Sequence, residues 1–349
     1  MWGSIPACLR RHKKKFIFLG GVVGGVVILN TYLKRKFREW ETQRTAEICD
    51  QIKRSNHFEG TMMTCDSVFL TCVPKIRQVI TKTVDVNEIV KQVSTNPPNK
   101  IELWEQLKVL VFTQALGEMY AQCLLCILLR VQMSILSGYV FMSRCTTSSA
   151  TEQQQKYMSR IEDFMLNGIN LVLDRVQRVV KENLKSVPLH QVLKLQDVER
   201  IVRSIQNSIL ESGENFLRDI TGSLMPASSS SVMNNEFLDN ISLETKDVIE
   251  CPDFSYVLQL CVDNGISSLM DRLSECYVML SDGTGTFINP HDFSAPLAKL
   301  IPIMHNVFCQ HKPTDQDSFV HNLLQLEPLN SFAANIYEAF SQKKNCLKM

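Results

Sequence analysis

The chain has 349 residues, and its 37 Lys and Arg against 36 Asp and Glu give a formal net charge of +1 at pH 7. This balance excludes the strongly basic composition of many nucleic-acid-binding proteins, so we expect no nucleic acid partner. Hydrophobic residues make up 45% of the chain and charged residues 21%. These proportions are typical of a well-packed globular protein with one large core or two smaller ones.

The first predicted element is an uncharged, apolar stretch from Phe16 to Leu33. As a helix it would reach roughly 27 Å, close to the ~30 Å hydrocarbon core of a bilayer. A cleaved signal peptide is disfavoured because no A-x-A-like site follows the stretch. A dinucleotide-binding turn is disfavoured because the glycines form two adjacent pairs and not G-x-G-x-x-G. A buried core helix does not fit the charged flanks, so the sequence predicts a transmembrane anchor over residues 16–33.

Basic residues lie on both sides of this anchor and suit anionic lipid headgroups. They are Arg10, Arg11, Lys13, Lys14 and Lys15 before it, and Lys34, Arg35, Lys36 and Arg38 after it. Because the two clusters are similar in size, they do not decide the orientation of the anchor. Twelve Cys without paired spacing suit a reducing compartment, so we expect the residues after Trp40 to lie in the cytosol.

The remaining chain has a helical pattern nearly throughout and no alternating strand run or hairpin signal, so the predicted fold class is all-α. Loops are expected at 145–150, 222–235 and 281–292, and a polar tail at 343–349. The predicted helices cover residues 37–58, 65–80, 86–93, 100–142, 151–186, 195–220, 253–277, 293–309, 318–326 and 330–340.

The helix from Lys100 is the longest in the predicted soluble part. The two prolines of residues 96–99 force a break before it, and Asn99 with Glu102 resembles a capping box. We expect a bend near Gly138 or earlier, and burial of Gly138 among its apolar neighbours.

Part of this helix, residues 109–129, is apolar enough to resemble a second membrane span. However, Gln114, Glu118 and Gln122 draw one polar line along it, and Arg130 interrupts its apolar continuation. A charge at membrane depth is costly, whereas a long core helix with one solvated edge is common. We therefore predict a central core helix.

Catalytic chemistry is poorly represented. The chain has no G-x-S-x-G, phosphate-binding loop, H-E-x-x-H or EF-hand loop. Cys123 and Cys126 form a C-x-x-C, but inside the most apolar helix and without a second pair or a nearby His. Two small core side chains are therefore favoured over a metal or redox site. We expect no enzymatic activity, no metal and no cofactor.

One group of residues suggests binding. Lys100, Trp104 and Lys108 are spaced four residues apart, so they share a helix face, with Trp104 at the edge of the core and a cation on either side. Ile89, Val90 and Val93, before the proline break, add apolar surface. Such a surface suits an amphipathic helix that carries a few acids. The alternative is that Trp104 is an ordinary core residue.

Several sequence blocks resemble the peroxin-3 family, the peroxisomal biogenesis factors of animals. The resemblance runs from Arg10 to about Phe340 and departs at the extreme N-terminus, at 145–150 and around 222–240. The blocks are RRHKKKFIFLGGVVGGVVIL, NKIELWEQLKVLVFT, LLRVQMSILSGYVF, PDFSYVLQLCVDNGISSLMD, APLAKLIPI and FAANIYEAF.

The resemblance implies a peroxisomal membrane protein in three parts. Residues 1–15 would be a short luminal basic N-terminus, 16–33 the transmembrane anchor, and 34–349 an elongated all-α cytosolic bundle. The implied role is that of docking receptor for peroxin-19, the soluble chaperone of newly made peroxisomal membrane proteins. Membrane lipids and other peroxisomal membrane proteins such as peroxin-16 are further candidate partners.

The resemblance carries chaperone binding onto Trp104, Lys100 and Val93, and Val90 and Lys108 complete the expected surface. Membrane targeting falls on Arg11, Lys13, Lys14 and Lys15. The alternative function is a membrane-anchored helical lipid-handling protein or enzyme. A large cavity with convergent polar groups would favour that alternative, whereas an exposed apolar groove at Trp104 favours docking.

Overall fold

A computed structural model describes residues 13–95, 97–142, 148–211, 220, 222, 236–281, 293–309 and 318–342. Within these ranges it describes all side chains except those of 13–29, 148–151, 236, 278–281, 308–309 and 318. The chain divides into two compact units, Met1–His57 and Phe58–Met349. The loops expected at 222–235 and 281–292 and the tail at 343–349 lie almost entirely outside the described residues.

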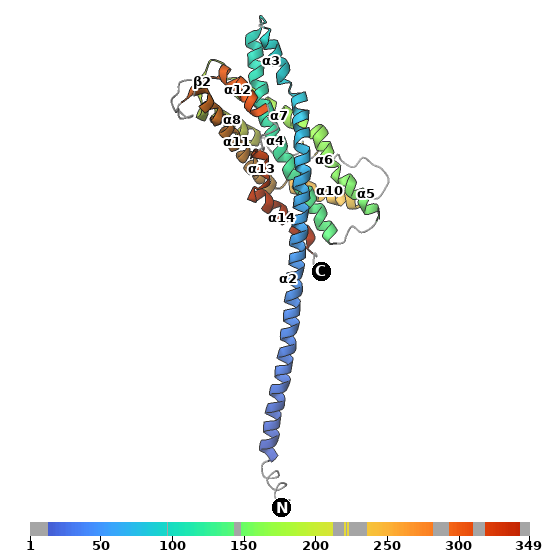
Figure 1. Ribbon diagram of the computed structural model, residues 1–349. Helices are drawn as coiled ribbons and strands as arrows, with labels where there is room; N and C mark the ends of the chain where they lie inside the picture. Colours follow the sequence, from blue (N-terminus) through green and yellow to red (C-terminus); the bar gives the residue numbers. More distant parts are fainter. Residues whose placement is uncertain are drawn as a thin grey trace, which may run out of the picture. The chain divides into compact units, whose positions relative to one another are not determined.

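The described elements are helical apart from two short strands (Figure 1), so the all-α prediction is confirmed. They are α2 (Lys13–Thr83), α3 (Val86–Ser94), α4 (Lys100–Phe141), α5 (Ser148–Met158), α6 (Arg160–Asp163), the π-helical turn η1 (Phe164–Gly168), α7 (Ile169–Leu184), β1 (Val192–Lys194), α8 (Leu195–Glu211), α10 (Glu236–Ile249), α11 (Pro252–Ser281), β2 (Ser294–Pro296), α12 (Leu297–Cys309), α13 (Ser318–Leu324) and α14 (Glu327–Ser341).

The first unit contains the N-terminal part of α2. Its side chains from Asn30 to Lys53 are exposed, and its surface carries i,i+4 ion pairs such as Arg35–Glu39 at 3.1 Å. The backbone of the predicted anchor is helical from Lys13 on, but the side chains before Asn30 lie outside the described set. The anchor therefore stays a prediction.

Helix α2 continues without interruption into the second unit, so the separate helix predicted over 65–80 is part of a longer one. Pro74 lies inside it. From residue 62 on, one apolar stripe with helical spacing is buried: Met62, Cys65, Phe69, Val73, Ile76 and Ile80. This stripe packs into the main core.

Helix α4 is the centre of the second unit and contacts α3, α7, α10, α11, α12, α13 and α14 (Figure 1). Among the described residues it is the one helix long and apolar enough to cross a membrane, and 72% of its most apolar window is buried inside the protein. Residues 111–129 are all buried. The prediction of a central core helix is confirmed.

The prediction that α4 has one solvated edge is wrong, because Gln114, Glu118 and Gln122 are all buried. The carboxylate of Glu118 accepts hydrogen bonds from Arg77 Nε of α2 at 2.7 Å and from Gln122 Nε2 at 2.9 Å. Glu118 is thus paired with another helix and Gln122 with Glu118, whereas the buried Oε1 of Gln114 has no hydrogen-bond partner among the described residues.

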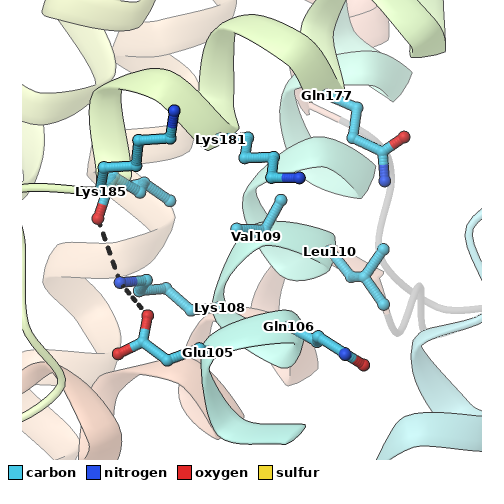
Figure 2. Close-up of a pocket in the computed structure, with 9 residues that line it drawn as sticks. Glu105, Gln106, Lys108, Val109, Leu110, Gln177, Lys181 and Lys185 are labelled. Atoms are coloured by element: carbon cyan, nitrogen blue, oxygen red, sulfur yellow. Dashed lines mark hydrogen bonds and ion pairs between the residues drawn. The ribbon is translucent and has the colours of Figure 1, made fainter. Parts of the chain in front are cut away.

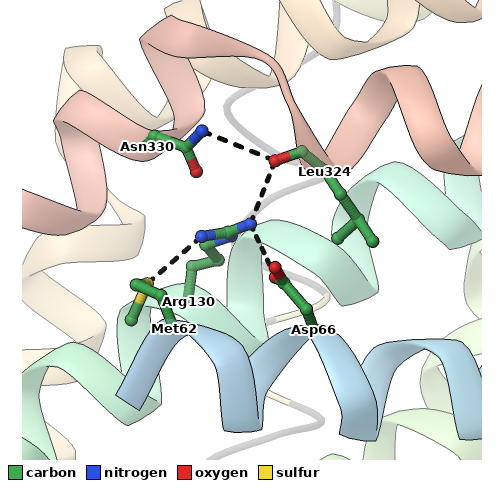
Figure 3. A network of polar contacts seen from close by, with 5 residues as sticks. All are labelled: Met62, Asp66, Arg130, Leu324 and Asn330. Atoms are coloured by element: carbon green, nitrogen blue, oxygen red, sulfur yellow. Dashed lines mark hydrogen bonds and ion pairs between the residues drawn. The ribbon is translucent and has the colours of Figure 1, made fainter. Parts of the chain in front are cut away.

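Arg130 is also buried, with 1% of its surface exposed. Its guanidinium donates to Asp66 Oδ1 at 2.8 Å and to the carbonyl oxygen of Leu324 at 3.3 Å, and it lies 3.2 Å from Met62 Sδ (Figure 3). Asn330 donates to the same carbonyl. One side chain of α4 therefore links α2 to the end of α13.

Gly138 is buried, as predicted, where α4 meets α14. A Cβ atom at this position would lie 2.7 Å from Phe340 Cβ and 3.0 Å from the Phe340 carbonyl carbon. Only a residue without a side chain allows this close approach. Helix α4 continues past Gly138 to Phe141.

Some elements differ from the prediction. Residues 151–186 are not one helix but α5, α6, η1 and α7, and α5 begins inside the expected linker. Helix α10 was not predicted. The three-residue strands β1 and β2 pair antiparallel, with Leu193 opposite Ala295. Strands this short carry too little alternation to be detected.

Candidate functional site

The surface around Trp104 is formed by α3 and the first turns of α4, which contact each other. Helix α3 begins at a side-chain cap, in which Asp85 Oδ1 accepts from the backbone N–H of Glu88 at 3.0 Å. Helix α4 begins at Lys100 as predicted, but the expected capping box is absent because Asn99 makes no side-chain cap hydrogen bond.

Trp104 is partly buried and packs against the core, so it is neither a fully enclosed core residue nor a free surface residue. Val93 of α3 is also partly buried, and Val90 is 37% exposed. Lys100 is exposed one turn before Trp104. These four predicted residues therefore lie in neighbouring helices with accessible surface.

Ile101 belongs to the same region and was not predicted. With 77% of its surface exposed, it is the most exposed large hydrophobic residue among the described side chains. Its signal in the sequence was its position on α4, on the side opposite the core residues Leu103 and Leu107. We define the α3–α4 surface as Val90, Val93, Lys100, Ile101 and Trp104.

The prediction that Lys108 is a solvent-facing cation beside Trp104 is wrong. Only 2% of Lys108 is exposed. Its ammonium donates to the carbonyl oxygen of Leu184 at 3.1 Å and pairs with Glu105 at 2.6 Å (Figure 2). It also donates to the carbonyl oxygen of Val187 at 2.8 Å. Lys108 thus satisfies carbonyl groups at the C-terminal end of α7, where a cation is favourable.

A pocket of about 450 Å³ lies beside Lys108, between α4 and α7. Figure 2 shows Val109 and Leu110 of α4 facing Gln177 and Lys181 of α7. Its polar lining consists mainly of exposed Lys and Gln side chains and of Lys108, whose ammonium is held by α7. Although its volume lies within the range of ligand pockets, this pocket lacks the convergent, unengaged polar groups that the lipid-handling or enzyme alternative requires.

The residues predicted for membrane targeting cannot be assigned a geometry. Arg11 lies outside the described residues, and of Lys13, Lys14 and Lys15 the structure describes the helical backbone only. Membrane targeting through these residues stays a prediction.

The C-x-x-C pair is confirmed as core, because Cys123 and Cys126 are fully buried. Burial raises the pKa of Cys126 to about 12, and has the same effect on Cys65. Thiols in this state react poorly, since the thiolate is the nucleophile and the metal ligand. Within the described ranges, no group of three or more His, Cys, Asp or Glu is placed to hold a metal ion.

Comparison with known proteins supplies an independent line of evidence. A family model described as Peroxin-3 matches residues 7–96, 91–169 and 143–339. The chain is 34% identical over 361 residues to "Peroxisomal biogenesis factor 3" of Mus musculus, covering 95% of this chain and 96% of that protein. Identity to the Homo sapiens protein of the same name is 33% over 370 residues, covering 98% of each chain. "Peroxisome biogenesis protein 3-2" of Arabidopsis thaliana is 21% identical over 328 residues, covering 84% of this chain and 86% of that protein.

Proposed function

Because this chain belongs to the peroxin-3 family of peroxisomal biogenesis factors, we propose that it is the membrane receptor that docks peroxin-19. The relatives are named for organelle biogenesis and not for a reaction, so the role is not enzymatic and the location is the peroxisome. In the proposed role, peroxin-19 arrives with newly made membrane proteins and its amphipathic helix binds the α3–α4 surface.

The observation that carries this proposal is the mixed exposure of the α3–α4 surface. Trp104 is held by the core on one side and accessible on the other, and Ile101 is 77% exposed beside it. A rigidly held aromatic residue with exposed apolar neighbours is a typical anchor for a partner helix. Lys100 adds a cation at the rim, where it would steer a helix that carries acidic residues.

We further propose that residues 16–33 cross the membrane, with 1–15 luminal and 34–349 in the cytosol. The apolar length, the basic flanks and the eight cysteines that are free in the described part of the chain support this arrangement. Protease added to intact peroxisomes should then digest nearly everything after Trp40. A large protected fragment would show that the bulk of the chain is luminal, where a cytosolic chaperone has no access.

The docking test uses the full chain in lipid nanodiscs and the labelled N-terminal peptide of peroxin-19. Trp104→Ala should weaken binding roughly 30-fold to 1000-fold, as expected for ~2 to 4 kcal/mol at an interface Trp. The melting temperature should change little. Ile101→Ser should weaken binding less and leave stability unchanged, because the side chain it removes is already exposed.

Two control variants separate docking from folding. Tyr256→Ala removes an aromatic residue that is 62% exposed on α11, and should leave affinity unchanged. Lys108→Ala removes the buried cation that α7 holds, and should cost about 1 to 3 kcal/mol of stability without changing the affinity of the folded fraction. If Trp104→Ala instead lowers stability by ~3 to 5 kcal/mol while the folded fraction keeps its affinity, Trp104 is core and the docking site lies elsewhere.

A further inference from the structure

The part of α2 that follows the predicted anchor has an aromatic face. Leu33, Phe37, Trp40 and Arg44 follow one another at intervals of four, three and four residues, so they line one side of the helix. The ring centroids of Phe37 and Trp40 are 5.8 Å apart, and Arg44 Cζ lies 5.1 Å from the centroid of the Trp40 ring. These rings are 62% and 53% exposed, respectively.

A basic face lies on the opposite side of the same segment. Lys34, Arg35 and Arg38 are all exposed, and Arg35 pairs with Glu39 at 3.1 Å. From residue 32 to residue 44 the helix carries five cations against two carboxylates. The two faces meet at a hollow lined by Leu33, Lys34, Phe37 and Arg38, so that a ring and two cations border the same space.

We propose that residues 32–44 are an interfacial collar that binds the anionic headgroups of the membrane surface. This inference rests on the proposed anchor at 16–33. Tyr and Trp are enriched at membrane interfaces, because their rings are apolar at one end and polar at the other. Cations on the same turns attract anionic lipid, each by roughly fivefold near the surface.

The position of the collar along the helix fits the thickness of the headgroup layer. At ~1.5 Å per residue, Phe37 lies about 6 Å and Trp40 about 10 Å beyond Leu33. The headgroup layer on each side of a bilayer is about 5 to 8 Å thick. Phe37 therefore falls within the layer, whereas the Cα atom of Trp40 lies about 2 to 5 Å beyond it. Because helical side chains point back toward the N-terminus, the Trp40 ring lies closer to the layer than its Cα atom.

A second copy of the chain is a poorer occupant of the aromatic face. The apolar part of the aromatic face ends at Trp40, because the next residue at the same helical spacing is Arg44. A paired helix would bring like charges from the two chains together along the same turns, which opposes association. An anionic lipid surface is complementary to both faces at once.

The test uses the full chain with Trp2→Phe and Trp104→Phe, so that Trp40 is the remaining tryptophan. The protein is reconstituted in vesicles of phosphatidylcholine with and without phosphatidylserine, and Trp40 fluorescence is quenched with neutral acrylamide. Quenching by acrylamide should be weaker in vesicles with phosphatidylserine than in vesicles without it, and severalfold weaker than in detergent. Lipids with a spin label at the headgroup should quench Trp40.

A charge variant and a matched control follow. Replacing Lys34, Lys36 and Arg38 by Gln should weaken the attraction to anionic lipid about 100-fold in total. The difference between the two vesicle types should then disappear. Removing three exposed cations elsewhere, with Lys91→Gln, Lys181→Gln and Lys299→Gln, should leave that difference intact.

Three outcomes would overturn the proposal, and they are distinguishable. If the chain resists alkaline carbonate but Trp40 is quenched as strongly in both vesicle types as in detergent, the collar lies in water although the anchor is real. If carbonate releases the chain, the anchor itself fails and the collar with it. If protection of Trp40 depends on the protein-to-lipid ratio and not on phosphatidylserine, a second copy covers the face.

Discussion

The contact between α4 and α14 at Gly138 gives a sharp test of the packing. Two of the three atoms nearest to a Cβ at this position are backbone atoms, the Phe340 carbonyl carbon at 3.0 Å and the Ser341 nitrogen at 3.2 Å. Backbone atoms cannot rotate away as a flexible side chain does. Gly138→Ala should therefore force α4 and α14 apart.

The expected magnitude follows from two opposing effects. Replacing Gly by Ala inside a helix stabilises it by about 0.5 to 1 kcal/mol. Overpacking of a well-packed contact costs about 1 to 3 kcal/mol. Gly138→Ala should thus destabilise the protein by about 1 to 2 kcal/mol, and Gly138→Glu by more than 3 kcal/mol, because it also places a carboxylate against an apolar surface.

Gly60 supplies the matched control. It lies in α2 on an exposed position, and a Cβ there would have no atom within 4 Å. Gly60→Ala should therefore stabilise the protein by about 0.5 to 1 kcal/mol. The assay is thermal unfolding of the full chain in a mild detergent, where 1 kcal/mol corresponds to a shift of roughly 1.5 to 2 °C for a unit of this size. A gain in stability for Gly138→Ala equal to that of Gly60→Ala would refute the packing argument.

Three further predictions concern the core. Residues 41–349, expressed alone, should be soluble and strongly helical without detergent, because the apolar window of α4 is buried; recovery only in detergent would contradict this. In native protein at mildly alkaline pH, an alkylating reagent should label exposed Cys49 quickly but Cys126 only after unfolding, as peptide mass spectrometry can measure. Burial lowers the pKa of His305, so the unfolded chain holds more protons there and the free energy of unfolding should fall as the pH drops below about 6.5. That fall should be smaller for His305→Gln in denaturant titrations, and an unchanged pH dependence would exclude the assignment.

The helices could be predicted where a segment has apolar residues at helical spacing within its own sequence. The apolar face predicted for residues 151–186 is buried at Ile161, Ile169, Val172 and Val176. Helix α10 had such a signal too, since its buried Leu238, Ile241 and Ile249 have helical spacing, and it was missed. The interruption of the long helix by η1 gave no comparable local signal.

The candidate site could be predicted only in part, because burial depends on what another helix supplies. Spacing correctly brought Lys100 and Trp104 to one region. The same spacing made Lys108 look solvent-facing, although the carbonyl groups at the end of α7 hold it in the interior. Those acceptors lie 76 and 79 residues further along the chain, so the sequence pattern around Lys108 does not indicate them. Conversely, Ile101 is exposed because the start of α4 is not covered in the same way.

The burial of Glu118 and Arg130 of α4 likewise depends on partners that are distant in the sequence. Asp66 and Arg77 of α2 pair with Arg130 and Glu118 of α4, at 2.8 and 2.7 Å. The partners are 11 residues apart on α2 and 12 apart on α4, or about 17 and 18 Å along two helices. Both pairs can therefore form together when the helices are antiparallel.

Burial raises the pKa of Asp66 although Arg130 opposes this effect, so desolvation offsets much of what that pair contributes to stability. An apolar stripe alone would tolerate a slip of α2 by one turn, about 5.4 Å. With the two pairs present, such a slip would separate both of them and leave the buried Arg130 and Glu118 without these partners. The main effect of the pairs is thus to specify the register of α2 on α4.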